Sequence, residues 1–205
     1  MVMGICYIVG AGELFGSFEA SPSDIILAAD GGLDHLAALG KTPDAVIGDM
    51  DSIGVLPDNL PSVRYPVRKD YTDSYLAYQY GRQKGYTKFV IFGGTGGRED
   101  HTFANYCLLI DAKMHGDDII LMGENTKTYA LVNEKKIIRG NPGATVSVFA
   151  FGAAARGVSI RGLTYEAENV TLSPEFPLGV SNSFSDTGTG EIEVREGSLL
   201  VMEQI

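Results

Sequence analysis

The sequence is poor in cysteine and contains no tryptophan. Its 205 residues include two cysteines, Cys6 and Cys107. Two cysteines are too few for a disulfide framework or for a zinc site built on cysteine alone. Because both lie within apolar runs, we expect them to be buried free thiols of a reducing compartment.

Long apolar segments are also missing. No run approaches the roughly 18 residues that are needed to cross a bilayer. Residues 1–13 have no basic region and no small-residue cleavage site, so we expect no signal peptide. Hydrophobic residues make up 44% of the chain and charged residues 20%, which is typical of a globular protein. We therefore expect a cytoplasmic protein with no membrane partner.

Positive charge is scarce as well. The chain has 16 Lys and Arg against 26 Asp and Glu, a net charge of −10, which argues against nucleic acid as the main partner. Of the 14 aspartates, 13 lie in residues 1–120, and Asp186 is the only later one. Short carboxylates near glycines are typical of divalent-cation sites, but Asp and Gly are also common in turns. Composition alone leaves both interpretations open.

The first half alternates short apolar runs with segments of helical spacing. This repetition predicts an α/β domain, a parallel sheet with helices on both faces. The predicted strands are Cys6–Val9, Ile25–Ala29, Ala45–Ile47, Lys88–Phe92 and Asp118–Met122, and the predicted helices are Leu33–Leu39, Thr72–Lys84 and Phe103–His115.

The second half loses the helical period. Short β-rich runs follow one another, so we predict an all-β sandwich and place the domains at 1–123 and 124–205. The predicted strands are Tyr129–Val132, Lys136–Ile138, Thr145–Phe151, Val158–Tyr165, Val170–Leu172, Glu191–Val194 and Ser198–Met202. The turn residues Arg195-Glu196-Gly197 predict that the last two strands form a hairpin.

Aspartates follow several predicted strands of the first half. Asp30 follows one strand, and Asp49 and Asp51 follow the next. Asp70 and Asp73 flank the start of a helix. In open α/β sheets ligands bind at the carboxyl ends of the strands. Each aspartate alone fits a cap or a turn, but together they favour a cation site.

The segment 93–101, Gly-Gly-Thr-Gly-Gly-Arg-Glu-Asp-His, is more specific. Gly93, Gly94, Gly96 and Gly97 let the backbone approach a phosphate closely, and a helix that starts near Thr102 points its amides at the same place. Arg98 adds a forked cation. The segment is neither a Walker A loop nor a dinucleotide fingerprint; Gly10-x-Gly12 has only the beginning of the latter. The structural alternative is a tight turn with an Arg98–Asp100 pair.

The histidines divide into two groups. His35 and His115 lie on predicted helices without partners at ligand spacing, so we interpret them as solvated or packed residues. His101, beside Asp100, is the one histidine that we place in a site. In the second half, adjacent Ser181 and Asn182 either line a pocket or form an Asx or Ser turn.

These segments together resemble the thiamine pyrophosphokinase family along nearly the whole chain. The matching pieces are Ala29-Asp30-Gly31-Gly32, Pro43-Asp44 with Gly48-Asp49-Met50-Asp51-Ser52, Lys69-Asp70-Tyr71-Thr72-Asp73, Gly93–His101 with Asn105, and Gly179-Val180-Ser181-Asn182. The family has an α/β domain followed by a β-sandwich. It transfers the pyrophosphoryl group of ATP to the hydroxyl of thiamine, giving thiamine diphosphate and AMP, with Mg²⁺.

The resemblance assigns roles to residues of this chain. It implies Asp49, Asp51 and Asp73 as magnesium-site acids and, with Asp100, as the catalytic residues; either Asp73 or Asp100 accepts the hydroxyl proton. It implies ATP binding by Asp30, Gly31, Gly93, Gly94, Gly96, Gly97, Arg98 and His101, and thiamine binding by Ser181 and Asn182. It also implies a homodimer whose sites are shared between subunits. Some family members stack thiamine on a tryptophan; here a Phe or Tyr must take that role.

Two other functions remain open from the residues alone. One is a metal-dependent glycosyl- or nucleotidyltransferase that uses Asp49-x-Asp51 to hold a sugar nucleotide. The other is a non-enzymatic sensor of nucleotides or small ligands. Formation of AMP from ATP, Mg²⁺ and thiamine would distinguish the kinase from both.

Overall fold

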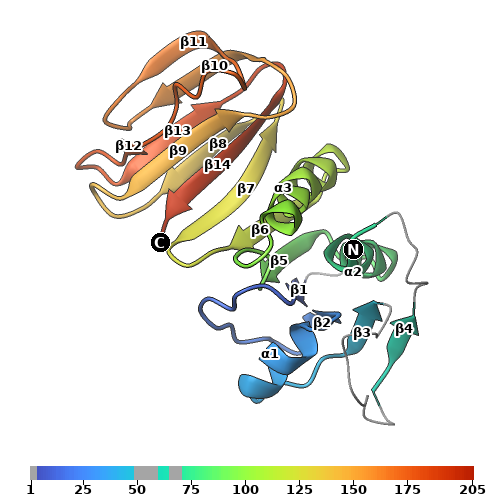
Figure 1. Cartoon of the computed structure of the whole chain (residues 1–205). Coiled ribbons are helices and arrows are strands. Elements are labelled where there is room, and N and C mark those ends of the chain that lie inside the picture. The colour runs from blue at the N-terminus through green and yellow to red at the C-terminus, as the bar shows by residue number, and fades with distance from the viewer. Residues whose placement is uncertain (1–3, 49–59, 65–70) are drawn as a thin grey trace. The chain divides into compact units, whose positions relative to one another are not determined.

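The structure is a computed structural model that describes residues 4–48, 60–64 and 71–205. The chain divides into two compact units (Figure 1). The first comprises Met1–Leu108 and Gly116–Glu124, and the second Leu109–His115 and Asn125–Ile205. The prediction of an α/β half followed by an all-β half is confirmed. Within the described ranges, no helix is long and apolar enough to span a membrane.

The first unit contributes six parallel strands to a mixed sheet. They run in the spatial order β6-β5-β1-β2-β3-β4, and every neighbouring pair is parallel. Their short apolar sequences suit strands that are buried on both faces. The strands are β1 (Cys6–Val9), β2 (Ile25–Ala29), β3 (Ala45–Gly48), β4 (Ser62–Arg64), β5 (Lys88–Phe92) and β6 (Asp118–Met122). β4 is not among the strands predicted from the sequence.

Helices α1 (Gly32–Ala38) and α2 (Asp73–Gln83) pack on this sheet. Leu36 of α1 joins a buried cluster that includes Tyr7 of β1. Gly81 of α2 packs against Cys6; a Cβ on this glycine would lie 2.8 Å from Cys6 Sγ. Neighbouring residues of a strand point to opposite faces, so the two helices contact opposite sides of β1.

Helix α3 (Glu99–Met114) begins four residues before the predicted start at Phe103. Glu99 and Asp100 therefore belong to its first turn, where carboxylates stabilise the positive end of the helix dipole. The expectation that both cysteines are buried is wrong for Cys107, which is exposed on this helix, whereas Cys6 is buried. α3 buries Leu108 and Leu109 instead, and an apolar run in a helix cannot bury every side chain.

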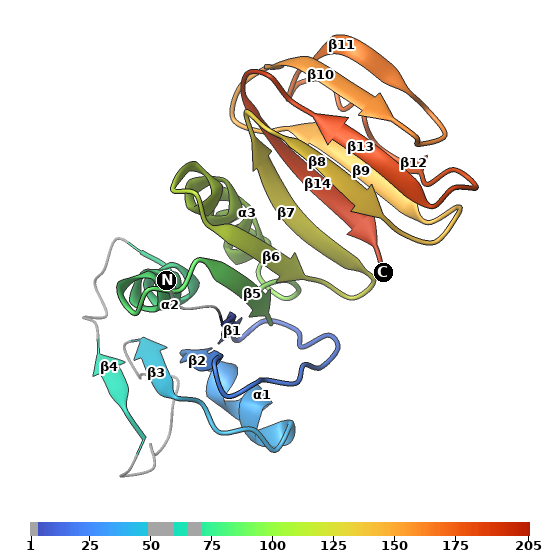
Figure 2. The same cartoon turned by 180° about the vertical axis from the view of Figure 1, so that it is seen from behind.

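The second unit is built from antiparallel strands (Figure 2). Four of them run in the order β12-β9-β14-β7 within the mixed sheet, and the other four form a separate sheet in the order β11-β10-β13-β8. The strands are β7 (Thr126–Val132), β8 (Lys135–Arg139), β9 (Thr145–Ala150), β10 (Ala155–Arg161), β11 (Ala167–Leu172), β12 (Asn182–Ser183), β13 (Thr189–Glu193) and β14 (Ser198–Gln204). β12 was not predicted, and β10 ends before Gly162, whose φ is +73°, rather than at Tyr165.

The predicted hairpin at residues 191–202 is wrong. β13 pairs with β10 and β8, whereas β14 pairs with β7 and β9, so residues 195–197 connect two different sheets. The turn residues fit a hairpin, but the two strands have different burial patterns. β13 alternates buried and accessible residues, while Leu199, Leu200 and Val201 of β14 are all buried.

Candidate active site

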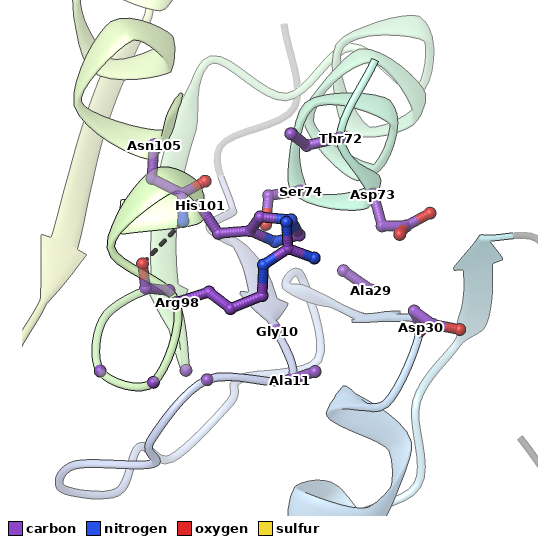
Figure 3. A pocket seen from close by; sticks show the side chains of 15 residues that line it. Gly10, Ala11, Ala29, Asp30, Thr72, Asp73, Ser74, Arg98, His101 and Asn105 are labelled. Carbon is purple, nitrogen blue, oxygen red and sulfur yellow. Dashed lines mark hydrogen bonds between the residues drawn. The ribbon is translucent and has the colours of Figure 1, made fainter. Parts of the chain in front are cut away.

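A pocket of about 350 Å³ lies at the carboxyl edge of the parallel sheet (Figure 3). It belongs to the first unit alone. Its walls are the loops that follow β1 and β5, the end of β2, and the first turns of α2 and α3. The lining residues are Gly10, Ala11, Gly12, Ala29, Asp30, Thr72, Asp73, Ser74, Gly93, Gly94, Gly96, Gly97, Arg98, His101 and Asn105.

The loops after β1 and β5 are joined by backbone hydrogen bonds. Gly12 N donates to Gly93 O and Glu13 N to Thr95 O, each at 2.8 Å. A Cβ on Gly12 would lie 2.5 Å from Thr95 O. Gly93 has φ +61°, and a Cβ there would lie 2.4 Å from Gly10 O. Glycine is therefore required at both positions for the backbones to meet.

Sequence reasoning missed the loop after β1 as part of the site. The signal was present, because Gly10-x-Gly12 directly follows a buried strand. The remainder of the dinucleotide motif is absent, so the pair does not predict a dinucleotide site. These glycines instead allow the two loops to contact each other.

Asn105 supports the glycine loop from α3. Its Nδ2 donates to Gly94 O at 2.7 Å, and the side chain is buried (Figure 3). The amide thus fixes the loop to the first turns of the helix that follows it.

Arg98 and Asp100 form a bidentate pair. Arg98 Nε lies 3.1 Å from Asp100 Oδ1, and Nη2 lies 2.6 Å from Oδ2. The hydrogen bond and charge of Arg98 lower the pKa of Asp100, and the carboxylate in turn raises the pKa of Arg98. The alternative of an Arg–Asp pair is therefore observed, but it uses only two of five guanidinium N–H groups. Arg98 and His101 both reach into the middle of the pocket (Figure 3).

Asp30 and Asp73 meet at the end of β3. A Cβ on Gly48 would lie 3.2 Å from Asp73 Oδ1 and 3.3 Å from Asp30 Cβ. Asp30 adopts φ +48°, and Asp73 is the first residue of α2, after the N-cap Thr72. The predicted metal ligands Asp49 and Asp51, together with Asp70, lie outside the described residues. Gly31 does not line the pocket but lies beside it, where a Cβ would be 3.0 Å from Ala11 Cβ.

These acids fit a magnesium ion in their chemistry. Carboxylate oxygens are the hard donors that Mg²⁺ prefers, and it takes few protein ligands beside phosphate and water. In the part of the chain that the structure describes, no three His, Cys, Asp or Glu side chains form a metal-binding group. The described residues contribute two carboxylates to such a site, those of Asp30 and Asp73.

Ser181 and Asn182 belong to the second unit. Asn182 Oδ1 accepts hydrogen bonds from Tyr165 N at 3.0 Å and Ser183 N at 2.8 Å, and its Nδ2 donates to Tyr165 O at 2.7 Å. One amide N–H remains for another partner. Ser181 has φ +58°, and its N donates to Ser147 Oγ at 3.0 Å. Asn182 thus holds the backbone of Tyr165, 17 residues away in sequence, and its contact with thiamine stays a prediction.

The three histidines have different surroundings. His35 Nε2 lies 2.7 Å from Gly12 O, and His115, the residue after α3, places Nδ1 2.8 Å from Asp111 O of that helix. His101 lines the pocket.

Comparison with protein families identifies both halves of the chain. Residues 19–121 match the model of the thiamin pyrophosphokinase catalytic domain, and residues 134–199 match that of the thiamin pyrophosphokinase vitamin B1 binding domain. The chain belongs to the thiamin pyrophosphokinase family. Members of this family transfer the pyrophosphoryl group of ATP to thiamine. A comparison with curated proteins gives no match.

Solved structures of thiamin pyrophosphokinases share the fold. The enzyme from Bacillus subtilis is 22% identical, with 98% of each chain covered and a TM-score of 0.89. That from Geobacillus thermodenitrificans is 24% identical, with 98% of this chain and 97% of the other covered and a TM-score of 0.84. The thiamin pyrophosphokinase from Candida albicans is 16% identical, with 100% and 90% covered and a TM-score of 0.74.

Proposed function

We propose that this chain transfers the pyrophosphoryl group of ATP to the hydroxyl of thiamine and binds ATP in the pocket of its first unit. The observation that carries this proposal is the convergence of a glycine cradle, Arg98 and two carboxylates at one sheet edge within the family's catalytic domain. Residues 1–123 act as the catalytic domain, and residues 124–205 as the thiamine-binding domain.

The glycine cradle and Arg98 hold the phosphates. Backbone amides can approach phosphate oxygens where no Cβ intervenes, and the first turn of α3 adds the positive end of its dipole. The three guanidinium N–H groups of Arg98 that Asp100 leaves can bind phosphate oxygens. His101, in the same first turn, contacts the nucleotide.

Asp49, Asp51 and Asp73, with Asp30 nearby, hold Mg²⁺. When bound, the ion supplies neutralisation of the phosphate charge and alignment of the β-phosphorus for in-line attack. Without it, the carboxylates of this edge would repel the anionic nucleotide.

The acid that accepts the hydroxyl proton is either Asp73 or Asp100. Pairing with Arg98 lowers the pKa of Asp100, which makes that carboxylate a weaker base. Asp100 serves the reaction by orienting Arg98.

Thiamine is bound by Ser181 and Asn182 of the second unit, in a cytoplasmic homodimer whose sites draw on two subunits. Tyr165 is our candidate for the stacking role that tryptophan has in some family members. The residue is 70% exposed, and its backbone N and O are both held by Asn182.

Steady-state release of AMP tests this proposal. Wild-type protein with ATP and Mg²⁺ should release AMP only when thiamine is added, and a chelator should abolish it. Asp51→Asn and Asp73→Asn should each lower turnover by about a hundredfold with the fold intact. Asp186→Asn, an exposed acid of the second unit, is the matched control and should leave turnover unchanged. Equal losses at Asp186 and Asp51 would contradict the metal site.

A further inference from the structure

One side chain outside the pocket is bonded to the pocket's wall. His35, in helix α1, places Nε2 2.7 Å from Gly12 O, across 23 residues of sequence. A carbonyl oxygen only accepts hydrogen bonds, so Nε2 carries the proton and donates it. His35 does not line the pocket, whereas Gly12 does.

Gly12 connects His35 to the phosphate loop. Its carbonyl receives the imidazole N–H, and its own N–H donates to Gly93 O at 2.8 Å. The next residue, Glu13, donates to Thr95 O at the same distance. Gly12 has no room for a side chain. Its peptide group is therefore the link through which His35 of α1 can fix the position of residues 93–95.

The glycine loop is otherwise fixed from its other side. Asn105 holds Gly94 O from α3, and Gly10 N donates to Phe92 O at the end of the β1–β5 pairing. Among the described residues, His35 is the one whose side chain bonds to the backbone of Gly12, in the loop after β1. The loop after β1 consists of small residues at this point, so side-chain packing restrains its backbone little.

We propose that His35 is a positioning residue for ATP: its Nε2–H holds Gly12, and through Gly12 it keeps the glycine loop in the shape that receives the phosphates. This rests on the proposed function, in which that loop binds ATP. The imidazole touches neither substrate nor metal in this role. Its contribution therefore falls on ATP binding rather than on the chemical step or on thiamine.

Three substitutions separate positioning from packing. His35→Leu keeps bulk and removes the donor. His35→Gln keeps an N–H at about the reach of Nε2, whereas His35→Asn places one nearer the helix. The control is His115→Leu, because among the described residues the His115 imidazole contacts Asp111, at the end of α3 and outside the pocket.

We expect His35→Leu to raise the KM for ATP about tenfold, the loss of one hydrogen bond, with kcat and the KM for thiamine within about twofold. Glutamine should restore the KM for ATP and asparagine should not. His115→Leu should leave all three constants unchanged. An unchanged KM for ATP in His35→Leu, or equal defects in the leucine and glutamine variants, would overturn the proposal.

Amide exchange reads the same contact without any catalysis. In His35→Leu the Gly12 and Glu13 amides should exchange at least about tenfold faster than in wild type, while the Gly10 amide stays protected. Unchanged exchange at Gly12 would refute positioning even if activity fell. If wild-type protein released no AMP with thiamine, the proposed function would fail, and accelerated exchange would still establish the contact between His35 and the loop.

Discussion

The contact between the two glycine loops makes a quantitative prediction for Gly93→Ala. Gly93 combines φ +61° with a hypothetical Cβ that would lie 2.4 Å from Gly10 O. Gly97 offers a matched control in the same loop. It has φ +67°, but among the described atoms a Cβ there meets nothing within 4 Å. Alanine therefore strains the backbone at both positions and forces the loops apart at Gly93 alone.

The expected losses of stability follow from the backbone strain and from the contact with Gly10 O. A left-handed backbone costs an L-residue about 1–2 kcal/mol, which applies to both variants. Relieving the contact requires a shift from 2.4 Å to at least 3.0 Å, which stretches the 2.8 Å bond between Gly12 N and Gly93 O. A lost hydrogen bond costs about 0.5–1.5 kcal/mol. Gly93→Ala should therefore be less stable than Gly97→Ala by about that amount, or roughly 1–6 °C in the unfolding midpoint.

Thermal unfolding of the 205-residue chain, followed by calorimetry, measures this difference. The amide exchange of Gly12 provides the local readout and should accelerate in Gly93→Ala only. Equal midpoints for the two variants, together with a protected Gly12 amide in Gly93→Ala, would refute the requirement for glycine at the loop contact.

Four further predictions concern substrates, charge and assembly. Arg98→Ala should raise the KM for ATP about tenfold or more and leave that for thiamine unchanged, because it removes a charge-assisted contact; steady-state kinetics with each substrate varied would show the reverse if Arg98 served thiamine. Asn182→Ala should raise the KM for thiamine several-fold and lower the free energy of unfolding by about 1–3 kcal/mol, since Tyr165 N and O lose their partner; an increase in the KM for ATP instead would contradict the division of substrates. The lowered pKa of Asp100 means that its pair with Arg98 persists above the carboxyl's ordinary pKa and is lost as pH falls through the lowered one; a carboxyl NMR titration should give a midpoint below 3.8, and one above it would exclude the pair in solution. Sedimentation should give a two-fold homodimer, and an active monomer at micromolar concentration would contradict shared sites.

Local sequence signals predicted the first unit well. The bounds of β1, β2, β5 and β6 were predicted correctly, because short apolar runs between glycines and polar turns leave one location for each strand. The three-residue β4 and two-residue β12 escaped, since runs so short carry no period. The hairpin prediction failed because a turn signal is local, whereas both strands pair with partners that lie far away in sequence.

The candidate site divides in the same way. Strand-end position and glycine density predicted that Asp30, Asp73, Arg98 and the glycine loop belong together, and they line one pocket. The contact from Gly12 to that loop was not predictable. It joins backbones 81 residues apart in sequence, and its only sign in the sequence is that glycine occupies these positions. The roles of individual acids depend on bound metal and nucleotide, which no spacing of residues encodes.

The identity of the products tests the central claim most directly. Phosphorus NMR of wild-type protein with ATP, Mg²⁺ and thiamine should show AMP and thiamine diphosphate appearing in equal amounts, with both transferred phosphorus atoms in the thiamine product. ADP together with thiamine monophosphate would contradict pyrophosphoryl transfer, and the absence of thiamine-dependent turnover would contradict the enzyme itself.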